Sequence, residues 1–295
     1  MKHYLIAIDA GGTFFKSAIV SSDAEVLENS LVTVPANNDG TPDQVREGYR
    51  RTLKLQLSHA EKAGIIPEAV AIDTPGPFDY AAGISLMKHK FKAIYGIELR
   101  PWIREVVGDL PVVFLHDSAA FMGGELWHSP FGDFKNAGGA MIGTGLGFAT
   151  VKDGVVLRRD DGEPLYSLWN VPMPGGKIVE DYVSGRGIAS RFRDGHTGAK
   201  EIEHLAREGN REALEVYRET GRILAEAAAP YLEKVGAEIF ILGGQISRSL
   251  PLFEDVMRER LSDVKTLKKI VRSERIETGH MLGAAYECFQ KLGLL

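Results

Sequence analysis

The stretch Tyr4–Thr13, YLIAIDAGGT, decides how this chain folds. Its isoleucine-rich apolar half predicts a buried strand that ends at Asp9. The turn Gly11–Thr13 follows, and the apolar character of residues 14–20 predicts a second strand, so the turn belongs to a hairpin. Such a turn can bind phosphate through glycine N–H groups and the threonine hydroxyl, and Asp9 can bind the Mg²⁺ of a nucleotide. Taken alone, the stretch fits an ordinary tight hairpin with a solvated aspartate better.

Two further glycine turns favour the phosphate-binding interpretation over the ordinary hairpin. Residues 139–151 repeat the first pattern, because an apolar strand runs into Gly143–Gly145 and a second strand leaves the turn. This predicts an internal duplication of one phosphate-binding hairpin in two half-domains. A third turn, Gly243–Gln245, follows a buried strand at 237–242, and its glycine pair allows a flat group such as adenosine to lie on the backbone. The three turns together favour a nucleotide site over three coincidences.

The composition is that of an ordinary globular protein, with 44% hydrophobic and 25% charged residues. A length of 295 residues predicts two domains, and the net charge of -5 argues against a nucleic-acid partner. No apolar stretch is long enough to span a membrane. Cys288 is the single cysteine, so an intrachain disulfide is impossible. We therefore expect a cytoplasmic protein without a signal peptide.

Strand-rich and helix-rich segments alternate along the chain. A strand at 111–115 ends at His116 and Asp117, and a helix with Ser118 as its cap is expected to follow. Asp9 and Asp117 therefore stand at strand ends, where ligands of open α/β sheets usually bind. Read without further information, Asp117 is more simply a helix-capping aspartate. Other expected elements are a third strand within 25–34, a strand at 69–72 before a stiff loop at 73–79, and helices at 42–63, 179–193, 211–235, 250–261 and 278–292.

The order and spacing of five motifs resemble those of the ROK sugar kinases, which belong to the actin/hexokinase/Hsp70-like superfamily. The motifs are Asp9-Ala-Gly-Gly-Thr13, Thr74-Pro-Gly-Pro77, His116-Asp117-Ser-Ala-Ala, Ile142-Gly-Thr-Gly-Leu-Gly147 and Leu242-Gly-Gly244. The segment 279–285 also resembles the closing helix of that family. The resemblance covers essentially the whole chain.

The resemblance implies an α/β fold of two domains, a duplicated actin-like ATPase or ribonuclease H-like fold with the active site in a central cleft. One domain would hold residues 1–116 and a C-terminal helix at about 279–295, and the larger one residues 117–278. Asp117 matches the catalytic base that accepts a proton from the attacking sugar hydroxyl. ATP and Mg²⁺ would be bound by Asp9, Gly11, Gly12, Thr13, Gly143, Thr144, Gly145, Gly243, Gly244 and Gln245, with Asp9 as the Mg²⁺ ligand.

The sugar side departs from the family pattern. Pro75 and Gly76 match the family's sugar loop, and His116 stands where an asparagine normally precedes the catalytic aspartate. Ser167 and Asn170 stand at the positions of a sugar-binding glutamate and histidine, and Lys90 at that of another asparagine. Mismatched partners would leave polar groups unsatisfied, so much of the usual hexose contact is replaced. Glu163 could substitute for the missing glutamate if the loop is shifted.

Two further departures concern charge and metal. Lys88, Lys90 and Lys92 form a basic cluster with His89 in the loop that should border the sugar, which suggests either a negatively charged or bulky substrate or simply a solvated loop. Many family members bind a structural zinc through several cysteines, but Ile178 occupies the last cysteine position here. A site of that kind needs four ligands that usually include thiolates, so no zinc site is expected.

These observations predict an ATP-dependent kinase that phosphorylates a hydroxyl of a sugar or sugar derivative. The alternative is a catalytically weak or inactive regulator of the same fold, a pseudokinase that responds to sugar. Retention of both Asp9 and Asp117 favours the kinase. Relatives with this fold are often dimers, so a homodimer is also expected.

Overall fold

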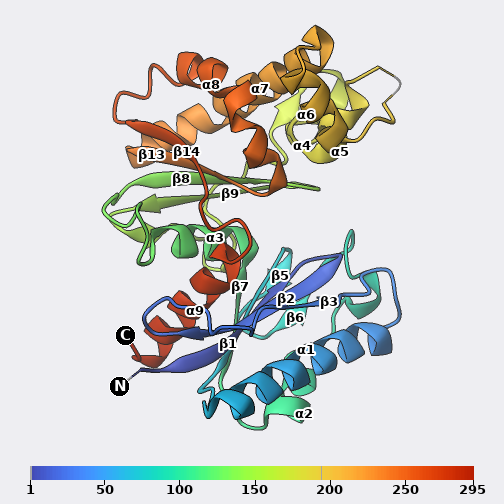
Figure 1. Ribbon diagram of the computed structural model, residues 1–295, viewed down its shortest axis with the longest axis vertical. Helices are drawn as coiled ribbons and strands as arrows, with labels where there is room; N and C mark the ends of the chain where they lie inside the picture. The colour runs from blue at the N-terminus through green and yellow to red at the C-terminus, as the bar shows by residue number, and fades with distance from the viewer. Residues whose placement is uncertain (1, 194) are drawn as a thin grey trace. The chain divides into compact units, whose positions relative to one another are not determined.

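The computed structural model describes residues 2–193 and 195–295 and divides into two compact units (Figure 1). The first unit holds the chain up to Gly132 together with Arg158–Glu163 and Glu277–Leu295, and the second holds Asp133–Leu157 and Pro164–Ile276. Residues 117–132 thus group with the first unit, although the sequence places the domain boundary after residue 116. The reason is helix packing, since α3 (Asp117–Leu126) packs along α9 (Gly279–Leu292).

The first unit is built on a five-stranded sheet in the order β3-β2-β1-β4-β7. The first three strands along the chain pair antiparallel, whereas β4 and β7 run parallel to β1. The hairpin predicted at Gly11–Thr13 is confirmed, with Ala10 opposite Phe15 in the ladder. The strands are β1 (Tyr4–Ala10), β2 (Phe14–Ser21), β3 (Val32–Pro35), β4 (Val70–Thr74) and β7 (Val112–His116).

The second unit repeats this topology, with strand order β10-β9-β8-β13-β14. Here β9 pairs antiparallel with both β8 and β10, and β13 and β14 run parallel to β8. The duplication inferred from the two Gly-Thr hairpins is therefore confirmed at the level of strand order and direction. The strands are β8 (Ala137–Ile142), β9 (Leu146–Lys152), β10 (Val155–Val156), β13 (Ile239–Gly243) and β14 (Lys269–Arg272).

Both faces of the first sheet are covered by helices, and this explains why β1 and β4 are almost uniformly apolar. Ile6 and Ile8 share a core with α1 (Pro42–Ala63) and α2 (Arg100–Val107), which lie along one face (Figure 1). Leu5 and Ala7, on the opposite face, pack against α3 and α9. The residues of β1 therefore alternate between two helical layers, and the odd-numbered ones face α9.

Local sequence sets the ends of the long helices. In α1, Thr41 and Gln44 form a capping box, Pro42 occupies the first turn, and Gly64 ends the helix in the left-handed conformation. This confirms the helix predicted at 42–63. In the second unit, α7 (Arg211–Val235) agrees with its prediction and is capped by Asn210 at its start and by Gly236 at its end.

Other expected elements are interrupted in the structure. The helix expected at 179–193 is two, α4 (Glu180–Val183) and α5 (Gly185–Ser190), because Ser184 is extended and its hydroxyl accepts a hydrogen bond from Gly187 N–H. The helix expected at 250–261 is a 3₁₀ segment, η3 (Gln245–Leu252), followed by α8 (Glu254–Arg260). The third strand is shorter than 25–34, since only Val26 forms an isolated bridge before β3 begins.

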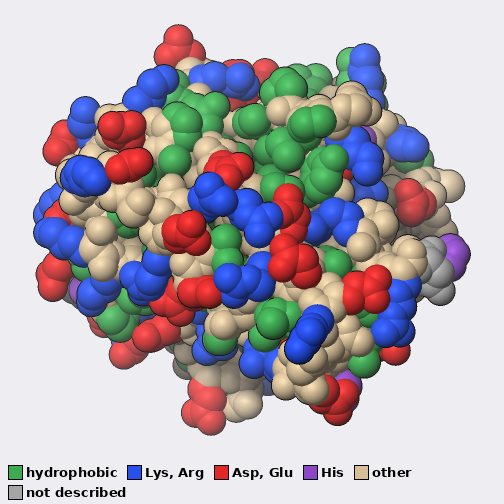
Figure 2. Space-filling model, turned by 90° about the horizontal axis from the view of Figure 1, so that it is seen from above, with side chains coloured by type: hydrophobic (Ala, Val, Ile, Leu, Met, Phe, Trp, Pro, Cys, Tyr) green, Lys and Arg blue, Asp and Glu red, His purple; other side chains and the backbone are tan. Residues whose placement is uncertain are grey.

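The remaining elements are short. They are β5 (Phe78–Asp79), β6 (Ile84–Ser85), η1 (Lys92–Ile94), β11 (Pro172–Met173), η2 (Pro174–Gly176), β12 (Lys177–Ile178) and α6 (Ala199–Arg207). Within the described residues, every helix is too short or too polar to cross a membrane. Figure 2 shows basic and acidic side chains interspersed over one face of the molecule.

The contact between α3 and α9 depends on glycine. A Cβ added to Gly283 would lie 1.7 Å from the carbonyl oxygen of Ala120, and one added to Gly124 would lie 1.9 Å from that of Gly279. Both positions face backbone, which cannot rotate out of the way as a flexible side chain can. The two helices therefore pack this closely only because glycine stands at both positions.

We predict that Gly283→Ala destabilises the protein by about 2 kcal/mol or more, because the added methyl forces α9 away from α3. Calorimetric thermal unfolding should show a lower midpoint. Gly198→Ala is the matched control, since its Cβ would meet nothing within 4 Å and its φ of -69 suits any residue. Equal midpoints for the two variants would show that α9 can move without loss.

Candidate active site

Three carboxylates gather at the carboxyl edge of the parallel strands of the first unit. Asp9 is the penultimate residue of β1, Asp73 lies beside it in register on β4, and Asp117 follows the last residue of β7. In addition to burial, charge repulsion from Asp117 raises the pKa of Asp9, and repulsion from Asp9 and Asp117 raises that of Asp73, because like charges repel at short range. The carboxyl edge of such a sheet is where ligands of α/β proteins usually bind.

Asp73 and His280 complete a group that sequence reasoning missed. Asp73 is fully buried, and neither of its carboxylate oxygens accepts a hydrogen bond. His280, the second residue of α9, places its Nδ1 3.5 Å from Asp73 Oδ1. The ring of Phe121 on α3 lies beside the imidazole, with the ring centroids 5.9 Å apart. Ligand atoms of Asp9, Asp73 and His280 all lie within 4.8 Å of one another.

Burial governs the protonation of this group. It raises the pKa of Asp9 and raises that of Asp73 to about 7, while the nearby His280 cation opposes both shifts. Burial would lower the pKa of His280, but the surrounding carboxylates, Asp73 first, raise it to about 9. Lys16, opposite Asp9 in the hairpin, adds a second cation and pairs with Glu277 at 2.9 Å. The Asp9 carboxylate suits Mg²⁺, which prefers oxygen ligands.

Asp117 is held in its ionised form by several donors. Its Oδ1 accepts hydrogen bonds from Ser118 N–H at 2.6 Å and from the Ser118 hydroxyl at 3.2 Å, and lies 2.9 Å from His116 Nδ1. Burial would raise the pKa of Asp117, but His116, with His280 and Lys90, holds it well below its usual range. The expectation that Ser118 caps the helix is wrong, because α3 begins at Asp117 and His116 is the capping residue.

His116 connects Asp117 to a second carboxylate. Its Nε2 lies 3.2 Å from Oε2 of Glu163, the residue proposed from sequence as a substitute for the missing glutamate. Burial would lower the pKa of His116, but Asp117 and Glu163 raise it to about 9. The two carboxylates therefore stabilise the charged form of the imidazole.

Glu163 also borders the Pro75–Gly76 loop. A Cβ on Gly76 would lie 2.0 Å from Glu163 Oε1, so only glycine allows the carboxylate to approach this closely. The hydroxyl of Tyr80 donates at 3.5 Å to the same oxygen. The first unit thus brings the predicted residues Gly76 and His116 against Glu163, and His116 connects Glu163 to Asp117.

Lys90 lies beside the first glycine turn. A Cβ on Gly12 would be 3.9 Å from Lys90 Cδ and 3.8 Å from Asn38 Oδ1. Asn38 fixes the loop, because its Oδ1 accepts a hydrogen bond from Phe91 N–H at 2.6 Å. The sequence assigned Lys90 to the sugar loop, whereas the structure places its side chain against the proposed phosphate turn.

The second unit places its two glycine turns on neighbouring strands. Gly143 follows β8 and Gly243 ends β13, its parallel neighbour. A Cβ on Gly244 would lie 2.4 Å from the carbonyl oxygen of Ile142, and its φ of 76 also favours glycine. Glu180 packs under the other turn, where its Oε2 accepts a hydrogen bond from Leu146 N–H at 2.8 Å.

Ser167 and Asn170 lie in the irregular segment before β11. Asn170 is exposed, and Ser167 is half-buried. Between them, Trp169 is 49% exposed, and the fully buried residue that packs this segment is Leu168. The single cysteine, Cys288, is buried in α9 of the first unit, where burial raises the pKa of its thiol to about 12.

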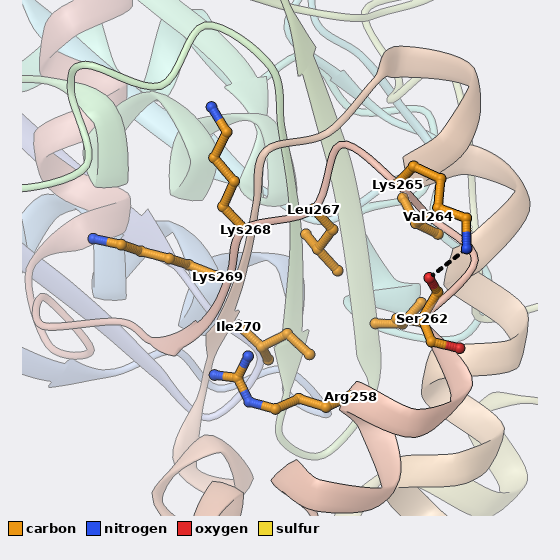
Figure 3. A pocket seen from close by; sticks show the side chains of 9 residues that line it. Arg258, Ser262, Val264, Lys265, Leu267, Lys268, Lys269 and Ile270 are labelled. Atoms are coloured by element: carbon orange, nitrogen blue, oxygen red, sulfur yellow. Dashed lines mark hydrogen bonds between the residues drawn. The ribbon is translucent and has the colours of Figure 1, made fainter.

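A surface hollow of ≈ 200 Å³ lies between the end of α8 and β14 in the second unit (Figure 3). Lys269 in its wall pairs with Ile239 at the amino end of β13, the opposite end of the strand from Gly243. Several cations of the wall already have acidic partners, as Lys268 has in Glu238. The hollow is therefore separate from the glycine turns of the same unit.

Comparisons with known proteins agree with these features. The family model described as ROK family matches residues 5–163 and 174–286. The glucokinase of Thermotoga maritima is 28% identical, over 98% of this chain and 98% of that protein. The N-acetylmannosamine kinase of Salmonella paratyphi B is 24% identical, over 85% of this chain and 86% of that protein. A ROK family glucokinase from Streptomyces griseus, solved with glucose and AMPPNP, has the same fold, with a TM-score of 0.79 at 21% identity over 96% of this chain and 98% of that one.

We predict a pH-dependent contribution of His116 to stability. Its pKa is about 9 in the fold and 6.5 without the fold, so the contribution is complete below about pH 6.5 and is lost as the pH rises through about 9. His116→Gln should remove on the order of 2 kcal/mol of this pH-dependent stability. Thermal unfolding at pH 6 and pH 9.5 measures the difference, and His204→Gln, whose side chain is 70% exposed, is the control. An unchanged pH dependence in His116→Gln would contradict the pairing with Asp117 and Glu163.

Proposed function

Because the chain belongs to the ROK family, we propose that it is an ATP-dependent carbohydrate kinase, which transfers the γ-phosphoryl group to a hydroxyl of a sugar or sugar derivative. The names of the glucokinase and N-acetylmannosamine kinase relatives support a sugar kinase. The observation that carries the proposal is the ionised, partly exposed carboxylate of Asp117 at the carboxyl edge of the first sheet.

Asp117 is assigned as the general base. An ionised carboxylate can accept the proton of the attacking hydroxyl as the new P–O bond forms. Its low pKa makes it a weak base, and this suits phosphoryl transfer, in which positioning and charge stabilisation carry most of the catalysis. His116 and Ser118 fix the orientation of the carboxylate through the contacts described above.

The phosphate side is assigned to the glycine turns. Gly11, Gly12 and Thr13 in the first unit offer backbone donors for phosphate, as do Gly143, Thr144 and Gly145 in the second. Gly243, Gly244 and Gln245 are assigned to the adenosine. Asp9 would hold Mg²⁺, which when bound neutralises phosphate charge.

The sugar side is assigned to Gly76, Pro75, His116 and Glu163, with Ser167 and Asn170 as further candidates. Carboxylates form paired hydrogen bonds with sugar diols, and Glu163 is the carboxylate that lies beside Gly76. The Glu163 oxygens keep accepting capacity beyond His116 and Tyr80, because each carboxylate oxygen has two lone pairs.

The first test of this function is Asp117→Asn. We expect the wild-type protein to form ADP with at least one member of a panel that includes glucose, mannose and N-acetylmannosamine. The variant should lose about 100-fold or more in kcat, because the amide cannot accept the proton. Sugar binding, measured by calorimetry, should persist, and exposed Asp109→Asn should retain wild-type turnover. Sugar binding without Asp117-dependent turnover would favour the sugar-responsive regulator instead.

The second test separates two roles for Lys90. Its position beside Gly12 predicts that Lys90→Gln lowers kcat/KM for ATP by about tenfold or more, because a cation near the transferred phosphoryl group is lost. The KM for sugar should change little. Lys92→Gln, from the same basic cluster but exposed, is the matched control. A higher KM for sugar with an unchanged KM for ATP would return Lys90 to the sugar side.

A further inference from the structure

The group Asp9, Asp73 and His280 has the arrangement of a metal site. Asp9 and Asp73 are register partners on parallel strands, so their side chains leave the same face of the sheet. That face is the one covered by α9, because Leu5 and Ala7 on β1 pack against the helix. The first turn of α9 carries His280 to the same place. Two strands and one helix thus bring two carboxylates and one imidazole together.

The environment of Asp73 is a second indication of a bound ligand, independent of this arrangement. It is 0% exposed, and both carboxylate oxygens lack a hydrogen-bond partner. A buried carboxylate without partners is unfavourable. The 3.5 Å separation from His280 Nδ1 is too long for a good hydrogen bond, and that nitrogen also lacks one. A cation bound between these atoms would satisfy them all.

We propose that Asp9, Asp73 and His280 together form a binding site for a divalent transition metal such as Mn²⁺ or Zn²⁺. All three side chains would bind the ion directly, and the site would bind it in the absence of nucleotide. The Mg²⁺ role assigned to Asp9 needs only one carboxylate; Asp73 and His280 add a buried oxygen ligand and a nitrogen ligand. Three ligand atoms at about 2.1 Å from one ion in a tetrahedral arrangement lie about 3.4 Å apart. The atoms here lie within 4.8 Å of one another, so a contraction of at most about 1.4 Å would complete the site.

The ligand set determines which metal is preferred. Imidazole nitrogen favours Mn²⁺, Co²⁺ and Zn²⁺ over Mg²⁺, which prefers oxygen ligands and retains its water. Asp9 and His280 are both partly exposed, with 21% of the His280 side chain accessible, and this gives the ion a path from solvent. The ring of Phe121 limits rotation of the imidazole.

The test is calorimetric titration of the nucleotide-free and sugar-free full chain with MnCl₂, ZnCl₂ and MgCl₂. We expect one Mn²⁺ or Zn²⁺ per chain, bound at least about tenfold more tightly than Mg²⁺. Asp73→Asn and His280→Gln should each weaken Mn²⁺ binding by about tenfold or more. Asp263→Asn and His204→Gln alter the same residue types at exposed positions and should leave binding unchanged.

The absorption spectrum of bound Co²⁺ provides a second readout, because it should change when the nitrogen ligand is lost in His280→Gln. Circular dichroism checks that each variant is folded. If a variant is not folded, the titration of the wild-type protein alone decides whether the metal site exists. Absence of Mn²⁺ and Zn²⁺ binding in the wild type would overturn the proposal, as would binding that both variants retain. In that case protonated His280 alone neutralises the two carboxylates. The titration contains neither nucleotide nor sugar, so an inactive kinase would not affect its outcome.

Discussion

The repulsion among three carboxylates at one sheet edge is the constraint on which the rest of the first unit depends. Asp9, Asp73 and Asp117 lie at or next to the ends of adjacent parallel strands, and repulsion adds to burial in raising the pKa values of Asp9 and Asp73. Cations from four different segments offset this negative charge. They are Lys16 from the hairpin, Lys90 from the loop after β6, His116 from β7 and His280 from α9. The fold thus brings distant parts of the chain to a single edge for an electrostatic reason.

Of these four cations, His280 on helix α9 is the one farthest along the chain from Asp9. The helix reaches the sheet from the C-terminal end of the chain and stays there through its close contact with α3, which starts at Asp117. The glycines at 124 and 283 set the distance between the two helices. Since His280 lies on one helix and Asp117 begins the other, this contact fixes the imidazole relative to the carboxylates. Packing in the core and charge in the site are therefore coupled.

The sequence predicts the features that depend on neighbouring residues. The hairpin at Gly11–Thr13, its repeat at Gly143–Gly145 and the capped helix at 42–63 follow from local apolar patterns and glycine. Asp73 was placed in a loop because the apolar run stops at Ile72, whereas pairing with β7 extends the strand to Thr74. His280 could not be linked to Asp73 from sequence, since 207 positions separate them and only tertiary packing joins them. The split at Ser184 was missed for a related reason, because a single extended residue interrupts an otherwise helical pattern.

The duplicated topology makes the two units directly comparable strand by strand. Asp9 and Asp73 lie near the ends of β1 and β4, whereas the equivalent strands β8 and β13 contain no carboxylate and lead into Gly143 and Gly243. Both copies thus present glycine turns, and only the first adds carboxylates. Carboxylates attract cations and accept protons, whereas exposed backbone amides attract anions and allow flat groups to approach. Both edges arise from the same scaffold, so the chemical difference rests on a few residues at the ends of the strands.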